Sequence, residues 1–90
     1  MKCIFDSTKN KANLEKHGIA LSEAKLLEWD QALSWIDRRK DYGEVRYVSL
    51  TPMKRRLYCV VYVATKLGRR IISLRKANLR ENDKYEEEID

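Results

Sequence analysis

The sequence predicts an α+β fold: a short strand and two helices, followed by a four-stranded antiparallel meander and a C-terminal helix. Two observations support this prediction. The N-terminal third has helical composition with candidate capping residues, whereas from residue 32 onward apolar residues alternate and β-branched and aromatic side chains become frequent. The connections between the later apolar segments have the length of hairpin turns, so consecutive strands should pair antiparallel.

Length and composition indicate one folded unit. The chain has 90 residues, of which 43% are apolar and 37% are charged, and it contains only three Gly and one Pro. These values are enough for a single core with a hydrated surface and are not typical of a disordered or low-complexity chain. We therefore expect one domain over residues 1–90.

The N-terminal residues predict a strand followed by a helix. Residues 3–5 are apolar and are followed by Asp6, Ser7 and Thr8, each of which is a good helix N-cap. Helical composition then continues over 9–17. Gly18 follows at the position where a glycine in the left-handed conformation commonly ends a helix.

Two further helices are predicted from capping residues. Ser22 can cap a second helix over 23–29. Near the C-terminus, Asn78 and Glu81 have the spacing of a capping box in which Asn replaces the usual Ser or Thr. We expect the closing helix over 78–88.

Between these helices, apolar alternation predicts four strands, over 32–37, 44–50, 56–64 and 69–75. The turn between the second and third of them is expected over 51–55, which contains Pro52. The strand 56–64 is apolar at both odd and even positions. Such a strand is expected to lie in the centre of the sheet, covered on both faces.

The formal net charge is +5, which favours polyanionic partners such as nucleic acids. Many small soluble domains are equally basic, so charge alone leaves both interpretations open. Basic clusters nevertheless fall in expected loops, at 38–40, 54–56 and 69–70.

Other classes of protein are disfavoured. Cys3 and Cys59 lie in apolar segments, as reduced buried thiols of an intracellular protein do. The single histidine and the absence of CxxC or HxxxH spacing argue against a metal site. No signal peptide and no apolar segment of about 20 residues is visible. We expect a cytoplasmic protein that needs no cofactor.

The first predicted helix carries a polar, mostly basic face. Lys9, Asn13, Lys16 and His17 are spaced at i, i+4, i+7 and i+8, so they project from one side of it. This face could be merely solvated, with a histidine near the helix C-terminus. Alternatively, it faces a phosphate, and His17 transfers protons near neutral pH.

Two further sets of cations need an explanation. The apolar part of the strand 69–75 runs directly into Arg75 and then Lys76, and no turn residue separates it from these two cations. Arg46 lies in the middle of an expected strand, where it must reach solvent, pair with an acid or bind a ligand. The bidentate guanidinium of arginine suits a phosphodiester.

Three segments, taken together, resemble the BrnT family of toxins from type II toxin–antitoxin modules. They are "FDSTKNKANLEKHGI" (5–19), "YGEVRYVSL" (42–50) and "RIISLRKANLRENDKYE" (70–86). The resemblance implies a RelE-like fold and an endoribonuclease that blocks translation by cutting RNA. It also implies a BrnA-type ribbon-helix-helix antitoxin, in a two-to-two complex, that binds operator DNA.

The residue patterns and this resemblance together nominate the site. The candidate catalytic residues are His17, Lys9, Arg46 and Arg75. The candidate RNA-binding residues are Lys16, Asn13, Tyr47, Lys76 and Tyr85. Cleavage without a metal ion is expected, because the 2′-hydroxyl of RNA can act as the nucleophile while cations stabilise the phosphorane. Two alternatives remain at this point: a nucleic-acid-binding domain without catalytic activity, and a basic protein-interaction module.

Overall fold

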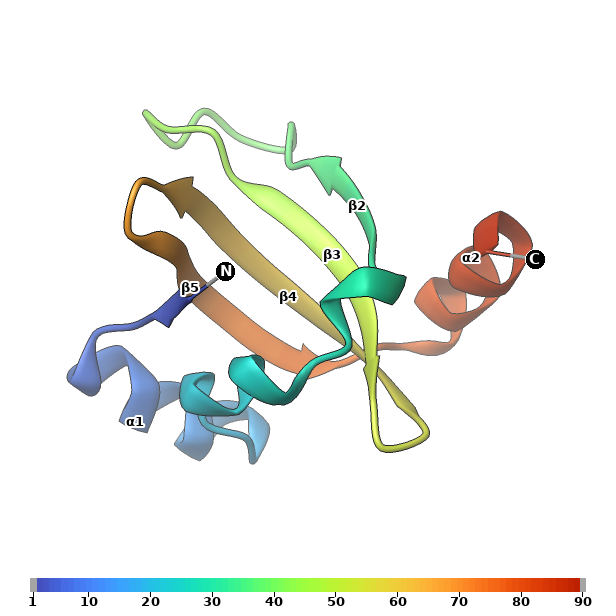
Figure 1. Cartoon of the computed structure of the whole chain (residues 1–90), viewed down its shortest axis with the longest axis horizontal. Helices are drawn as coiled ribbons and strands as arrows, with labels where there is room; N and C mark the ends of the chain where they lie inside the picture. The colour runs from blue at the N-terminus through green and yellow to red at the C-terminus, as the bar shows by residue number, and fades with distance from the viewer. Residues whose placement is uncertain (1, 90) are drawn as a thin grey trace.

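A computed structural model describes residues 2–89 and contains one mixed sheet of five strands with helices around it (Figure 1). The elements are β1 (Cys3–Ile4), α1 (Ser7–His17), the 3₁₀ segments η1 (Leu21–Leu26) and η2 (Trp29–Gln31), β2 (Leu33–Ile36), β3 (Tyr47–Met53), β4 (Arg56–Thr65), β5 (Gly68–Lys76) and α2 (Leu79–Ile89). The strand order is β1-β5-β4-β3-β2, with β1 parallel to β5 and the other pairs antiparallel. The predicted α+β class and the antiparallel meander are confirmed.

The two faces of the sheet carry different cores. One face packs against η1 through a buried cluster that includes Leu21, Val60 and Leu74, all fully buried. The other face carries Leu50 and Cys59, and α2 covers one end of it (Figure 1). The central position predicted for 56–64 is confirmed, because β4 contributes side chains to both clusters. Among residues 2–89, every helix is too short and too polar to cross a lipid bilayer.

The first helix begins and ends where capping chemistry predicts. Asp6 is its N-cap, and the Asp6 Oδ2 atom accepts a hydrogen bond from the Lys9 backbone N–H at 3.0 Å. Gly18 has a φ of 74° and donates its N–H to the Leu14 carbonyl at 2.8 Å. These contacts confirm the predicted end at Gly18 and select Asp6 among the three candidate N-caps, so the helix starts two residues earlier than expected.

The prediction of a second α-helix over 23–29 is wrong, because the segment forms two short 3₁₀ helices instead. Its buried side chains explain the difference. Leu21, Ala24 and Leu27 are spaced by three residues and all enter the core. A repeat of three residues per turn matches a 3₁₀ helix. Ser22 lies inside η1 and is not its N-cap.

The second and third strands of the meander are joined by a tighter turn than predicted. β3 extends through Pro52 to Met53, so the expected turn over 51–55 and the strand over 44–50 are displaced. Only Lys54 and Arg55 form the turn, with φ values of 54° and 75°. Positive φ at both residues is the requirement of a two-residue type I′ hairpin. The turn was predicted to begin before Lys54 because the segment contains Pro52, but in the structure Pro52 is part of β3.

The capping box at the start of α2 is confirmed. The Glu81 backbone N–H donates to Asn78 Oδ1 at 2.8 Å, and the Asn78 N–H donates to Glu81 Oε1 at 2.9 Å. Cys3 and Cys59 are both free thiols, as predicted. Cys59 is buried in the sheet face that α2 partly covers, and Cys3 is only half-buried.

Candidate active site

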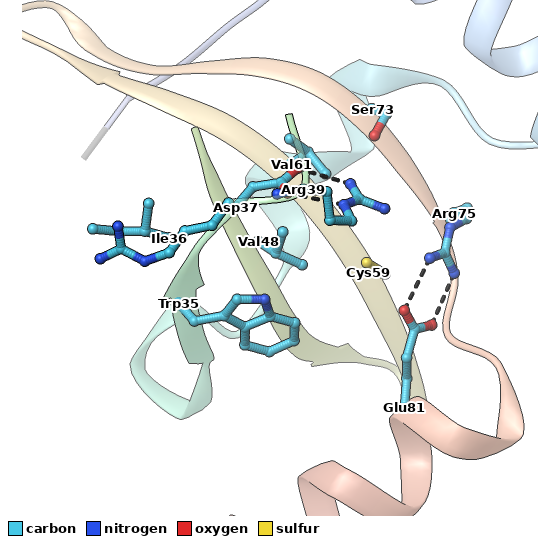
Figure 2. Close-up of a pocket in the computed structure, with 11 residues that line it drawn as sticks. Trp35, Ile36, Asp37, Arg39, Val48, Cys59, Val61, Ser73, Arg75 and Glu81 are labelled. Atoms are coloured by element: carbon cyan, nitrogen blue, oxygen red, sulfur yellow. Dashed lines mark hydrogen bonds and ion pairs between the residues drawn. The ribbon is translucent and has the colours of Figure 1, made fainter. Parts of the chain in front are cut away.

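A cavity of about 440 Å³ lies on the sheet face that α2 partly covers (Figure 2). Its floor is formed by β3, β4 and β5. One wall is the end of β2 and the segment that follows it, and the opposite wall is the end of β5 with the first turn of α2. The lining residues used below are Trp35, Asp37, Arg39, Val48, Cys59, Val61, Ser73, Arg75 and Glu81.

A β-bulge directs the β5 side chains into this cavity. Val61 pairs with Ser73 and Tyr62 pairs with Ile71, so Ile72 is an extra residue in β5. Without the bulge, residues 71, 73 and 75 would share one face, because side chains alternate along a strand. The bulge leaves Ile71 in the core of the other face and turns Ser73 toward the cavity.

Arg75 is held at the rim of the cavity by a bidentate ion pair with Glu81 (Figure 2). Arg75 Nη1 lies 2.8 Å from Glu81 Oε1, and Nη2 lies 2.9 Å from Oε2. The hydrogen bonds from Arg75 lower the pKa of Glu81 below its ordinary value, although partial burial opposes this effect. The carboxylate therefore stays ionised and fixes the guanidinium in one orientation.

This pairing leaves one edge of the Arg75 guanidinium available. Nη1 uses its second hydrogen for the Lys76 carbonyl, at 3.2 Å. Among the residues that the structure describes, neither Nε nor the second N–H of Nη2 has an acceptor. These two donors lie on the same edge, so Arg75 can bind a phosphate in a bidentate manner without releasing Glu81.

A second ion pair forms the opposite wall (Figure 2). The Asp37 side chain is 1% exposed and accepts hydrogen bonds from Arg39 Nε at 2.9 Å and Nη2 at 2.7 Å. The Tyr42 hydroxyl donates to the same carboxylate at 3.0 Å. Chiefly through the Arg39 bonds, the pKa of Asp37 is held well below its ordinary range, despite burial. This wall is rigid and ionised.

A smaller hollow of about 210 Å³ adjoins the cavity along α1. Lys9, Lys16 and His17 line it, together with Ile72 and Ser73. The structure thus brings together three of the polar residues predicted on this helix face. Ser73 lines both hollows, so the basic face of α1 and the cavity that contains Arg75 border the same residue.

Asn13 lies in the same hollow, but its side chain is occupied. It is 8% exposed, and its Nδ2 donates to the carbonyls of Ile19 and Leu74, each at 2.8 Å. Its Oδ1 accepts from the Leu74 N–H at 3.3 Å. These bonds fasten α1 to β5, so the geometry favours a structural role for Asn13 over the predicted contact with RNA.

The sequence of the chain matches a known protein family. Residues 5–81 match the family model described as the ribonuclease toxin BrnT of type II toxin–antitoxin systems. The chain belongs to this family. Both hollows are made of residues inside the matched range. No curated protein sequence matches the chain.

This BrnT chain is therefore a ribonuclease toxin of a type II toxin–antitoxin system, with RNA as its substrate and a cognate antitoxin as its partner. The predicted resemblance and the predicted ribonuclease class are confirmed. The family match covers strands β2 to β5, the basic face of α1 and the Arg75–Glu81 pair.

Four predicted site residues of the BrnT chain line neither hollow: Arg46, Tyr47, Lys76 and Tyr85. Tyr47 stacks on Tyr62 with ring centroids 5.5 Å apart, on the sheet face opposite Arg75. Arg46 precedes β3, stacks on Tyr42 at 4.2 Å and donates to Glu44 at 3.2 Å. Arg46 is thus connected to the Asp37 wall only through Tyr42, since Arg46 stacks on the Tyr42 ring and the Tyr42 hydroxyl donates to Asp37.

The last two predicted RNA contacts differ from each other. Lys76 is exposed at the end of β5, but it pairs with Tyr58, which packs on the other core, so its side chain projects from the sheet face opposite Arg75. Tyr85 instead packs against the sheet, and its hydroxyl donates to the Gln31 carbonyl at 2.7 Å. Burial raises the pKa of Tyr85 above its ordinary value. Its role is to hold α2 against η2.

Part of the cavity was not predicted from the sequence of this toxin. Trp35 and Ser73 were predicted only as strand residues, because nothing local marks them as parts of a site. Asp37 and Arg39 had a recognisable signal. An acid at a strand end, two residues before an arginine, has the spacing of a local ion pair.

The Asp37 wall generates a testable prediction for the toxin. Replacing Asp37 with Asn should lower the free energy of unfolding at pH 7 by about 1–3 kcal/mol, because the buried acceptor of Arg39 and Tyr42 loses its charge. Asp83→Asn is the matched control, since Asp83 is an exposed acid in α2. Chemical denaturation of the three proteins measures the difference.

Acidification provides the second arm of this test. The folded-state pKa of Asp37 is depressed, so its contribution is present above the unfolded pKa of about 3.9 and is lost as the pH falls below it. The stability gap between the wild type and Asp37→Asn should therefore narrow at low pH. A gap that stayed constant from pH 7 to pH 2 would contradict this assignment.

Proposed function

We propose that the toxin cleaves single-stranded RNA without a metal ion, in the groove that runs from the basic face of α1 to Arg75. The observation that carries this proposal is the free edge of the Arg75 guanidinium. It offers two N–H donors on one side, while Glu81 holds the other side. A scissile phosphate bound there would lie beside Ser73, which borders the hollow that His17 lines.

The reaction proposed is an internal transfer of the phosphate. The 2′-oxygen of the ribose attacks phosphorus, and the bond from phosphorus to the 5′-oxygen of the next nucleotide breaks. The products are a 2′,3′-cyclic phosphate and a free 5′-hydroxyl. One group takes the proton from the 2′-hydroxyl and another gives a proton to the leaving oxygen. We assign one of these transfers, as base or as acid, to His17, with Lys9 and Lys16 as the alternatives.

Arg75 supplies the electrostatic part of the catalysis. Negative charge on the phosphate increases in the transition state, and a donor pair already oriented toward it stabilises that charge without reorganising. The ion pair with Glu81 provides this orientation. Lys16, Lys76 and Arg46 are proposed to bind phosphates outside the cavity, Lys76 on the opposite face of the sheet and Arg46 beside Tyr42.

The carboxylates of the cavity support cleavage without metal. Hard cations such as Mg²⁺ are held by carboxylate oxygens. Asp37 and Glu81 line the cavity, and each is already bound by an arginine, which a metal ion would have to displace. Within residues 2–89, no group of three or more His, Cys, Asp or Glu residues is placed to hold a metal ion.

The partner proposed is a BrnA-type ribbon-helix-helix antitoxin. Such antitoxins dimerise, so a two-to-two assembly is expected, with operator DNA contacted only through the antitoxin. A net charge of +5 favours an inhibitor that presents acidic groups to the groove. Because the substrate is RNA used in translation, the toxin is proposed to act in the cytoplasm.

Replacing Arg75 tests the catalytic assignment. Arg75→Ala should slow single-turnover RNA cleavage about 10²-fold or more, whereas RNA affinity should fall less, because other phosphate contacts remain. Arg75→Lys should also be slow, since lysine keeps the charge and loses the fork. Lys54→Ala, in the β3–β4 turn, is the control, which should weaken binding slightly and cleave at the normal rate.

Stability separates this assignment from a purely structural role for the ion pair. A thermal melt shows whether Arg75→Ala is folded. A folded variant that cleaves poorly supports the assignment. A folded variant that cuts RNA at the wild-type rate refutes it, and so does Arg75→Lys if it restores full activity.

Chelation tests the metal-free mechanism. Cleavage by the purified toxin should continue in EDTA at the same rate, because no step assigns a role to a metal ion. A metal-dependent nuclease in the same buffer provides the control for complete chelation. Loss of toxin activity that returns on addition of Mg²⁺ or Mn²⁺ would overturn the mechanism.

Co-expression tests the partner. The toxin and the product of the adjacent reading frame should elute together from a sizing column, with the mass of two copies of each. The mixture should not cleave RNA until the antitoxin is removed. Separate elution of the two proteins would refute the proposed partner. A mass corresponding to one copy of each would exclude the two-to-two assembly.

A further inference from the structure

The cavity is larger and more apolar than phosphate binding at Arg75 requires. A phosphate held by the free edge of Arg75 needs only the rim. The floor behind it is formed by Val48, Cys59 and Val61, which offer a phosphate no strong donor. Burial raises the pKa of the Cys59 thiol to about 11, so the floor is neutral at physiological pH. The interior therefore suits an uncharged group.

The charges on the walls of the cavity also favour an uncharged group over a second phosphate. Three arginines line the cavity. Arg39 is paired with Asp37 and Arg75 with Glu81, whereas Arg38, after the end of β2, is exposed and has no carboxylate partner among the described residues. A second phosphate inside the cavity would approach both carboxylates, and the unpaired cation Arg38 lies at the exposed surface instead of deep in the site. A flat, neutral ring with polar edges meets neither penalty. A volume of about 440 Å³ lies in the range of small-ligand pockets, roughly 300–1,000 Å³.

Trp35 supplies an aromatic surface in this cavity (Figure 2). Its half-buried indole packs against the floor cluster, and the Lys84 ammonium of α2 lies 4.9 Å from the ring centroid. A cation–π contact at an exposed site contributes about 0.5–1 kcal/mol. Stacking of a nucleobase on an aromatic ring contributes about 1–3 kcal/mol. A base can therefore displace Lys84, which is exposed and free to move to a phosphate.

We propose that this cavity is a nucleobase subsite, in which one unpaired base of the RNA substrate stacks on Trp35 above the β4 floor. The inference rests on the function proposed above and adds the part of the nucleotide that the cavity recognises. Arg39 and Ser73 are placed to meet the edge of the base. Nη1 of Arg39 and the Ser73 hydroxyl carry no hydrogen bond among the described residues. A base in a duplex would first have to leave its stack, so single-stranded RNA is preferred.

Binding of small nucleotides tests the subsite apart from cleavage. The probes are AMP, CMP, GMP and UMP, with ribose 5-phosphate as the ligand that keeps the phosphate and lacks the base. At least one nucleotide should bind 10-fold or more tightly than ribose 5-phosphate, measured by NMR titration of the wild-type toxin. Trp35→Leu should weaken that nucleotide about 5- to 150-fold, the equivalent of one stacking interaction, and leave ribose 5-phosphate unchanged.

Two further variants keep the test decisive. Trp35→Phe retains an aromatic ring and should bind nucleotides with intermediate affinity, even if Trp35→Leu proves unstable in a thermal melt. Trp29→Phe is the matched control, because Trp29 packs on the opposite face of the sheet. It should bind nucleotides like the wild type, and nucleotide binding should quench its remaining Trp35 fluorescence.

Several outcomes would overturn the subsite. Equal affinity for ribose 5-phosphate and every nucleotide would do so, as would unchanged nucleotide binding by both Trp35 variants. If the Trp35 variants instead weakened only the complex with the antitoxin, the cavity would take a protein side chain. Cleavage of RNA by the wild type is measured in parallel. If the toxin cleaves RNA but binds no nucleotide more tightly than ribose 5-phosphate, the subsite alone is rejected. If the toxin does not cleave RNA, the proposed function is rejected.

Discussion

The Glu81 carboxylate connects the parts of this molecule on which the site depends. One of its oxygens accepts the Asn78 N–H that begins α2, and both oxygens hold the Arg75 guanidinium. A single side chain thus fixes the start of a helix, the end of β5 and the direction of the cation that faces the substrate. Since an arginine alone would be mobile, this pairing converts a flexible charge into an oriented one. Its remaining edge then needs little further ordering when RNA binds.

The bulge in β5 is the second constraint. An extra residue at Ile72 turns Ser73 and Arg75 to the face that carries the cavity, while Ile71 stays in the opposite core. The same extra residue lines the hollow beneath α1. The proton-transfer candidate His17 and the phosphate-binding candidate Arg75 therefore line two hollows that share Ser73, although they belong to different elements. Bulges commonly re-aim side chains next to active sites in this way.

Sequence patterns predicted best where the determining contacts are local. The caps Asp6, Gly18 and Asn78 were all correct, because a cap is decided by hydrogen bonds to residues three or four positions away. The segment after Gly18 was mistaken for an α-helix, since its 3₁₀ form follows from how the core receives its apolar side chains. The turn at Lys54 was misplaced for a related reason. Sheet pairing imposes positive φ on a residue that seldom adopts it.

The sequence by itself determined the order of the elements, the basic character of the chain and the family to which it belongs. It also supplied most of the candidate cations, because their charge and spacing are visible without coordinates. Only the tertiary structure decided which of them share a site. Tyr47 lies on the opposite face of the sheet, and the Asn13 side chain is hydrogen-bonded to β5. Trp35 and Asp37, in contrast, line the cavity. Those outcomes depend on strand register, on one bulge and on ion pairs between distant elements, none of which a local pattern encodes.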